Sequence, residues 1–158
     1  MIAIPALNEE ENVLVDMGAE LNGYKSDMTR SFYYGHKNDR FQEIYDLVLA
    51  AQNNALLGMR DGVKSNKVHE LAMDVIADGG YGEHFPHGLG HGIGLDIHEM
   101  PFLSLIRTPS TLEAGMAITV EPGVYIEGWG GVRIEDLVTI TNNGLLILSK
   151  CPKNPYIR

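Results

Sequence analysis

The chain has 158 residues, of which 44% are hydrophobic and 21% charged, and it carries a formal charge of -9. This length predicts one globular domain that buries about two-thirds of its unfolded surface. The acidic balance argues against nucleic acid and anionic membranes as partners, because both attract basic proteins. The single cysteine, Cys151, excludes an internal disulfide, and no apolar run approaches the ~20 residues that span a bilayer. Residues 1–7 lack the features of a signal peptide, so we expect a cytoplasmic protein.

The first half of the chain predicts two strands followed by two helices. Strands are expected at Asn12–Met17 and Thr29–Tyr34, with a turn at Leu21–Gly23 between them. A long helix is predicted from Asn38 or Asp39 to about Arg60, because apolar residues recur there at steps of three and four. The same spacing predicts a second helix from about Asn66 to Ala77.

The second half predicts β structure. Strands are expected at Met116–Val120, Gly123–Ile126 and Val132–Ile140. The last of these is predicted to pair with Leu145–Leu148 across a Thr-Asn-Asn-Gly turn, which is a strong hairpin signal. The order of elements favours an α+β fold in which an antiparallel sheet carries helices on one face.

Histidine and glycine are concentrated in one segment of the chain. Residues 84–99 hold four of the six histidines, including His87, His91 and His98. A lone histidine is usually a surface or satisfied core residue, but the glycines flanking His91 allow close approach of a ligand or metal. The segment matches neither a zinc finger nor His-Glu-x-x-His, and it lacks the context of a dinucleotide-binding loop.

Four carboxylates occupy unusual places in or beside the predicted strands: Asp16, Asp27, Glu121 and Glu135. Each of them alone is most simply interpreted as an acid that faces water. Together they are harder to dismiss, because few lysines and arginines lie near them and an unpaired buried carboxylate costs on the order of several kcal/mol. A metal cluster would satisfy all four at once.

The order and context of these residues resemble the pita-bread (M24) metallopeptidases, specifically the Xaa-Pro group of prolidases and aminopeptidases P. Asp16 and Asp27 lie 11 residues apart, and the likeness covers about Val13 to Leu148. Three further segments carry it: His-Gly-Leu-Gly-His-Gly-Ile-Gly with His91, Val-Glu-Pro-Gly-Val-Tyr with Glu121, and Gly-Gly-Val-Arg-Ile-Glu-Asp with Glu135. The 14-residue interval between the two glutamates resembles the Xaa-Pro enzymes, whereas methionine aminopeptidases carry a longer insertion there.

The resemblance implies a truncated pita-bread fold and a centre of two divalent metal ions. Asp16 would chelate the first ion, Asp27 and Glu135 would bridge both, and His91 and Glu121 would complete the second. Four carboxylates also balance the charge of two divalent cations. An oxygen-rich ligand set favours Mn²⁺ or Co²⁺, with Zn²⁺ or Fe²⁺ as alternatives.

The resemblance also implies catalytic roles in hydrolysis of the peptide bond before proline, with short proline-containing peptides as substrates. Glu121 would act as general base beside the attacking water. His87 and His98 would hold the substrate and stabilise the tetrahedral intermediate. Two roles fit Arg133: contact with a substrate carboxylate, or orientation of the bridging Glu135.

The N-terminal region departs from the family pattern. Residues 1–11 contain no histidine where the family has a further active-site histidine, and the N-terminal domain of the Xaa-Pro enzymes is absent from the sequence. We therefore interpret residues 1–158 as the C-terminal portion of a pita-bread catalytic domain, with an exposed edge that favours homo-oligomers. Two hypotheses stand: an Xaa-Pro dipeptidase or aminopeptidase, and a truncated, non-catalytic metal-binding or interaction module of the same fold.

Overall fold

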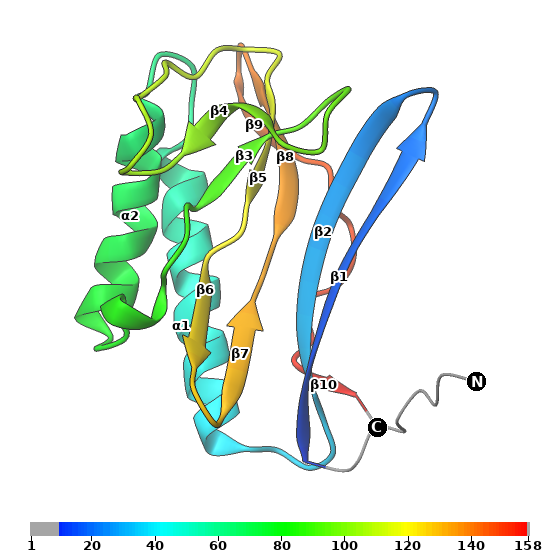
Figure 1. Ribbon diagram of the computed structural model, residues 1–158, viewed down its shortest axis with the longest axis vertical. Coiled ribbons are helices and arrows are strands. Elements are labelled where there is room, and N and C mark those ends of the chain that lie inside the picture. Colours follow the sequence, from blue (N-terminus) through cyan, green and yellow to red (C-terminus); the bar gives the residue numbers. More distant parts are fainter. Residues whose placement is uncertain (1–9, 158) are drawn as a thin grey trace.

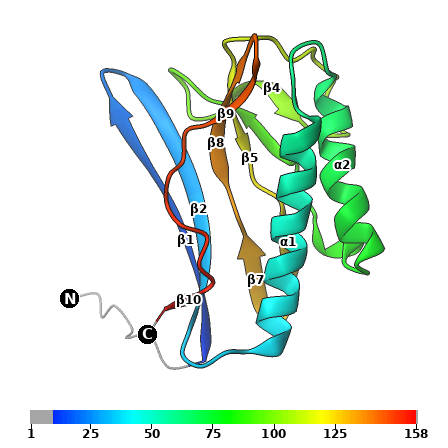
Figure 2. The same cartoon turned by 180° about the vertical axis from the view of Figure 1, so that it is seen from behind.

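The computed structural model describes residues 10–157. Two helices, α1 (Asp39–Gly58) and α2 (Ser65–Asp78), pack on one side of the central strands, and a long β hairpin stands on the other side (Figure 1). The reverse view shows the same order of layers (Figure 2). The predicted α+β fold with helices on one face of an antiparallel sheet is confirmed. The expectation that residues 1–7 are not a signal peptide lies outside the described residues.

The N-terminal hairpin consists of β1 (Glu11–Leu21) and β2 (Tyr24–Tyr34). Both predicted strands are confirmed, but the hairpin extends well beyond their inner ends, to a turn at Asn22 and Gly23. These two residues have φ angles of 54° and 87°, the left-handed conformation that a tight two-residue hairpin requires. The extension was missed because its side chains are mostly exposed and show no apolar alternation.

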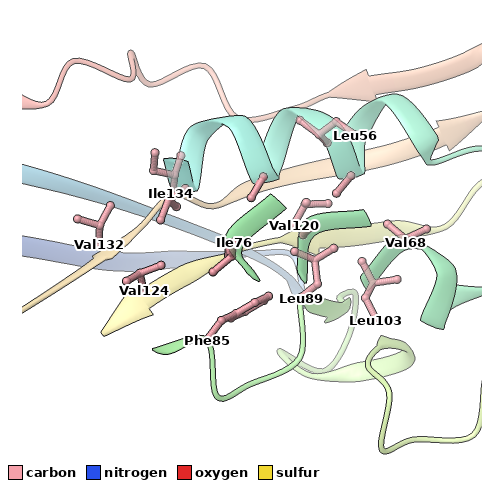
Figure 3. Close-up of a cluster of buried hydrophobic side chains, with 14 of the residues drawn as sticks. Leu56, Val68, Ile76, Phe85, Leu89, Leu103, Val120, Val124, Val132 and Ile134 are labelled. Carbon is pink, nitrogen blue, oxygen red and sulfur yellow. The ribbon is translucent and has the colours of Figure 1, made fainter. Parts of the chain in front are cut away.

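Both predicted helices are confirmed to within about two residues. The side chain of Asn38 caps α1 by accepting a hydrogen bond of 2.9 Å from the backbone N–H of Phe41. The apolar faces of α1 and α2 point toward the strands, where they meet a cluster of buried side chains (Figure 3). This cluster includes Leu56, Val68, Ile76, Phe85, Leu89, Leu103, Val120, Val124, Val132 and Ile134.

The prediction of a single strand at Val132–Ile140 is wrong, because the structure contains two strands there, separated by Ile134 and Glu135. The segment before the break pairs in a two-stranded ladder, and the segment after it joins a five-stranded sheet. The order of this sheet is β4 (Glu99–Leu103), β3 (Gly90–Gly92), β5 (Ala117–Val120), β8 (Asp136–Thr141), β9 (Gly144–Ile147). The facing strand is broken at Glu121 and Pro122, and Pro122 has no N–H to donate to a ladder. The strands around the break are β5 (Ala117–Val120), β6 (Gly123–Ile126), β7 (Gly130–Arg133) and β8 (Asp136–Thr141). The predicted hairpin to β9 (Gly144–Ile147) is confirmed.

Two strands in the histidine-rich segment escaped prediction: β3 (Gly90–Gly92) and β4 (Glu99–Leu103). The glycines of β3 serve strand packing, since a Cβ atom on Gly90 would clash with the carbonyl of Thr119 and one on Gly92 with that of Met100. A three-residue, glycine-rich strand such as β3 carries no alternation that a sequence could reveal, and the proline in β4 argues against a strand there.

A buried ion pair joins the hairpin to the central sheet. Arg30 of β2 donates a hydrogen bond of 2.8 Å to Asp136 of β8, and both side chains are at most 2% exposed. The C-terminal segment completes this contact: the Cys151 carbonyl accepts from Arg30, and the Lys153 ammonium lies 2.6 Å from the other Asp136 oxygen. Figure 2 shows this segment running along β2 from β9 to β10 (Tyr156–Ile157), which pairs parallel with β2.

No helix within residues 10–157 is both long enough and apolar enough to cross a lipid bilayer.

We predict that Arg30→Met lowers the free energy of unfolding by about 3–5 kcal/mol, because it leaves the buried Asp136 charge short of its partner. Urea denaturation measures the change. The control is Lys67→Met, which removes an exposed ion pair with Glu70 and is expected to cost at most about 0.5 kcal/mol. If the two variants lose the same free energy of unfolding, the buried ion pair does not stabilise the packing of the hairpin on the sheet.

Candidate metal centre

The five predicted ligands converge where the hairpin faces the five-stranded sheet. Asp16 and Asp27 come from β1 and β2, His91 from β3, Glu121 from the end of β5, and Glu135 from the break between β7 and β8. The hairpin register places Thr29 opposite Asp16 and Gly18 opposite Asp27. The backbone N–H of Glu135 donates to the Thr29 carbonyl at 3.1 Å, which docks the hairpin on the sheet beside the ligands.

The ligand atoms of Asp27, His91 and Glu135 all lie within 4.8 Å of one another. Glu121 borders the same group, because its Oε1 lies 3.3 Å from Nε2 of His91. Nε2 also lies 3.9 Å from Oδ2 of Asp27. Distant parts of the sequence therefore present one imidazole and three carboxylates to a common point.

The hydrogen bonds of His91 determine which ring nitrogen faces this point. Nδ1 lies 3.0 Å from the carbonyl oxygen of Gly92, which can only accept, so Nδ1 carries a proton. Nε2 faces Asp27 and Glu121: it donates to Glu121 when the ring is protonated, and in the neutral ring it carries the lone pair. A backbone carbonyl that fixes the tautomer in this way is the usual arrangement around a metal-binding histidine.

Two threonines, missed by the sequence analysis, support the glutamates. The hydroxyl of Thr29 donates to Oε2 of Glu135 at 2.6 Å, and that of Thr119 donates to Oε1 of Glu121 at 3.0 Å. Thr119 also accepts a hydrogen bond from the backbone N–H of His91 at 3.0 Å. The available signal was the period of two, which puts Thr119 and Glu121 on one strand face.

Crowding of the carboxylates changes their acidity. Burial, followed by repulsion from Glu121, raises the pKa of Glu135 to about 8, although the Thr29 hydrogen bond opposes this change. Burial and the nearby Asp16 likewise raise the pKa of Asp27. Burial lowers the pKa of His91, but the hydrogen bonds to Glu121 and Gly92, together with the charges of Glu121 and Asp27, outweigh burial and leave the pKa raised. The cluster therefore has an excess of negative charge that a cation would relieve.

Asp16 is the most exposed of the five, and its carboxylate is bound by Arg133. Arg133 also donates through Nε to Thr29 and through Nη1 to the hydroxyl of Tyr125. Since Thr29 in turn donates to Glu135, the guanidinium connects two of the carboxylates and commits a donor of each of its three nitrogens to the site. Of the two roles expected for Arg133, this geometry favours orientation of the ligands.

A cavity of about 400 Å³ opens beside the cluster and is lined by His87, His91, His98, Glu121 and Arg133, among others. The exposed ring of His98 lies 4.2 Å from that of His91, measured between centroids. The His87 ring is fixed by the Gly88 carbonyl at 2.7 Å and by the hydroxyl of Tyr125 at 3.0 Å. Both predicted catalytic histidines thus border the same cavity as Glu121.

Arg107, which the sequence analysis did not single out, is the second arginine that lines the cavity. Its guanidinium lies over the ring of Phe102, 5.1 Å from the centroid. Within residues 10–157 no carboxylate forms an ion pair with it. The cavity wall therefore combines Glu121 and His98 with an arginine that is available to an anion.

Comparison with known proteins agrees with this geometry. Residues 3–142 match the model of metallopeptidase family M24. The chain belongs to this family. It is 46% identical over 147 residues to an uncharacterized peptidase of Staphylococcus haemolyticus, and 46% identical over 138 residues to an Xaa-Pro dipeptidase of Pyrococcus furiosus. These matches cover 93% and 87% of the chain, respectively.

Solved structures show the same relationship. The structure of an Xaa-Pro dipeptidase from Bacillus anthracis superposes with a TM-score of 0.91 at 44% identity, over 96% of this chain and 42% of that protein. The two curated relatives are also longer, since the matched regions make up 42% and 39% of their lengths. The resemblance to M24 Xaa-Pro peptidases is confirmed, and the chain spans about two-fifths of the length of these relatives.

The donor set of this M24 chain fits divalent metal ions. Carboxylate oxygens and an imidazole nitrogen are common ligands of divalent metal ions, and the fixed His91 tautomer offers the lone pair that ligation needs. The carboxylates raise one another's pKa values, so a bound cation would replace repulsion by attraction. The side chains that could bind such ions together are those of Asp27, His91, Glu121 and Glu135. Asp16 is linked to this group by its ion pair with Arg133.

We predict that the metal-free protein loses stability as the pH rises from about 4.5 to about 8. The folded pKa of Glu135 lies above its ordinary value of 4.5, so the folded state binds more protons than the unfolded state in this window. The loss amounts to at most about 5 kcal/mol, because each tenfold change in proton affinity corresponds to about 1.4 kcal/mol.

Urea denaturation of chelator-treated protein across this window measures the effect. Glu135→Gln cannot ionise, so it is expected to flatten the pH profile. A profile that is equally steep in the wild type and in Glu135→Gln would contradict the burial and repulsion assigned to this carboxyl.

Proposed function

We propose that the chain forms the dinuclear metal centre and part of the substrate cavity of an Xaa-Pro peptidase, an enzyme that hydrolyses the peptide bond before proline. The convergence of Asp27, His91 and Glu135 carries the proposal, because three ligand atoms from three separate elements lie within 4.8 Å of one another. The M24 relatives named Xaa-Pro dipeptidase support the substrate class.

In this proposal the ligands keep the roles expected from the sequence. Asp16 would hold the first ion, Asp27 and Glu135 would bridge the two, and His91 with Glu121 would complete the second. Mn²⁺ or Co²⁺ is the preferred metal, because the ligands other than His91 are carboxylates. The burial of Glu135 supports its bridging role, since an ionised carboxylate that is 2% exposed and faces other acids needs a compensating positive charge.

The chain's own residues would position and move the protons of hydrolysis. Bound divalent ions would supply Lewis-acid activation of water and of the scissile carbonyl. Glu121 accepts a proton from the attacking water and delivers it to the leaving proline nitrogen, and the Thr119 hydroxyl orients this carboxylate by donating to Oε1. His98, exposed at the cavity wall, donates a hydrogen bond to the carbonyl oxygen as negative charge develops there.

Arg107 is the residue we assign to the free carboxylate of a short substrate. Arg133 is engaged by Asp16, Thr29 and Tyr125, whereas Arg107 lines the cavity with its guanidinium stacked on Phe102. A guanidinium can bind a carboxylate through two parallel hydrogen bonds. Such a contact would favour substrates whose C-terminus lies close to the scissile bond.

Self-association and a cytoplasmic location belong to the proposal as well. Within the described residues β1 pairs only with β2, and Leu14, Met17 and Leu21 on β1 are exposed. An exposed strand edge with apolar side chains favours pairing with another chain. The acidic composition with a single cysteine is compatible with a reducing cytoplasm.

We predict that the protein loaded with Mn²⁺ or Co²⁺ binds about two ions per chain and hydrolyses an Xaa-Pro dipeptide. His91→Ala is expected to lose metal from the second site, because its Nε2 is a ligand. His98→Ala is expected to retain both ions and to lower turnover about a hundredfold, because its contribution arises in the transition state. Elemental analysis and a hydrolysis assay on the same samples measure both effects.

Equal loss of metal in His91→Ala and His98→Ala would overturn the division of roles between the histidines. Two bound ions without detectable hydrolysis in the wild type would favour the alternative, a non-catalytic metal-binding module of the M24 fold. Fewer than one ion per chain, unchanged by Asp27→Asn, would overturn the metal centre itself.

We predict that Arg107→Ala raises KM for an Xaa-Pro dipeptide about tenfold, the effect of losing ~1.4 kcal/mol from a charged hydrogen bond. The matched control is the same dipeptide with an amidated C-terminus, which removes the charge from the substrate. If Arg107 binds the carboxylate, the variant and the wild type hydrolyse the amide with similar KM. A tenfold change with both substrates would assign Arg107 to cavity shape instead.

A further inference from the structure

One polar side chain occupies a core position on α1. The buried face of this helix includes Val48, Gln52 and Leu56 at successive steps of four, and Gln52 is 0% exposed. A buried amide without partners costs on the order of 1–3 kcal/mol, so a glutamine here requires a reason.

The reason is visible in its hydrogen bonds. The amide nitrogen of Gln52 donates to two backbone carbonyls, that of Val120 at 2.9 Å and that of Ile134 at 3.0 Å. Its amide oxygen accepts from the ammonium of Lys153 at 2.7 Å. Because an ammonium can only donate, Lys153 determines which end of the amide faces the carbonyls. All the principal hydrogen-bonding groups of Gln52 are thereby satisfied.

The two carbonyls belong to the residues that immediately precede Glu121 and Glu135. They lie where the β5–β8 ladder ends at Val120 and the β6–β7 ladder ends at Arg133. Regular strand pairing is therefore interrupted at the two glutamates, and Gln52 spans the interruption from the helix side. The distance between the two peptide groups is set by the two N–H bonds of one rigid amide.

We propose that Gln52 is a positioning residue for the metal centre, one that fixes the spacing of Glu121 and Glu135 through the peptide groups before them. Lys153 of the C-terminal segment locks the amide in the required orientation. This inference rests on the proposed metal centre. A purely structural role is represented on the same helix by Asn54, whose side chain donates to the Leu71 carbonyl at 2.8 Å and ties α1 to α2 away from the glutamates.

The pair Gln52→Met and Asn54→Leu separates the two roles, because each replaces a helix amide by an apolar group of similar size. Both are expected to lower the urea midpoint. Only Gln52→Met is expected to weaken Mn²⁺ binding, by about tenfold or more, as is usual when a residue that orients a ligand is removed. Isothermal titration of the chelator-treated full chain with Mn²⁺ measures affinity, and the visible spectrum of the Co²⁺ form reports the ligand geometry.

Lys153 provides a second test that leaves the helix core intact, because its side chain is 24% exposed. Lys153→Met is expected to weaken Mn²⁺ binding in the same direction, and Lys153→Arg, which can still donate to the Gln52 oxygen, is expected to restore it. Unchanged Mn²⁺ affinity and an unchanged Co²⁺ spectrum in a folded Gln52→Met or Lys153→Met would overturn the inference. Failure of the wild type to bind metal would instead overturn the proposed function, so the two failures are distinguishable.

Discussion

Repulsion among carboxylates that share one face of the fold is the constraint on which the rest of this structure depends. Asp27, Glu121 and Glu135 surround the imidazole of His91 at distances of a few ångströms, and burial raises the pKa of Glu135 to about 8. A protein that keeps these carboxylates together must counteract the electrostatic repulsion between them. The surrounding hydrogen bonds of Thr29 and Thr119 do this for the side chains, each donating to one glutamate oxygen.

The backbone is arranged to the same end. Regular strand pairing is interrupted at Pro122 and at Ile134, and this lets the segments that follow β5 and β7 turn Glu121 and Glu135 toward the hairpin. Arg30 donates to the carbonyl of Glu135 and to that of Thr29, so the ion pair with Asp136 also secures the peptide next to a ligand. Stability and ligand geometry therefore depend on the same buried contacts between β2, β8 and the C-terminal segment.

The two arginines near the cavity illustrate how geometry distinguishes residues that a sequence treats alike. Arg133 ends β7, two residues before Glu135. From the sequence this placement was compatible with two roles, contact with a substrate carboxylate and orientation of Glu135. Its three donor groups reach Asp16, Thr29 and Tyr125, which leaves the guanidinium committed to the centre. Arg107 lies five residues beyond Phe102 in a segment without regular structure, and only the folded chain brings it to the cavity.

The sequence by itself determined the family, the two helices and the C-terminal hairpin, and it indicated the residues that we propose as metal ligands. These rest on local signals: the period of a helix, the chemistry of a turn, and carboxylates and histidines in distinctive short segments. Only the tertiary structure decided that the strand at Val132–Ile140 divides, that Thr29 supports Glu135, and that Gln52 bridges two carbonyls. Each of these features depends on contacts between segments that lie far apart in the sequence. A local sequence pattern does not show which distant backbone or side-chain group will need a hydrogen-bond donor.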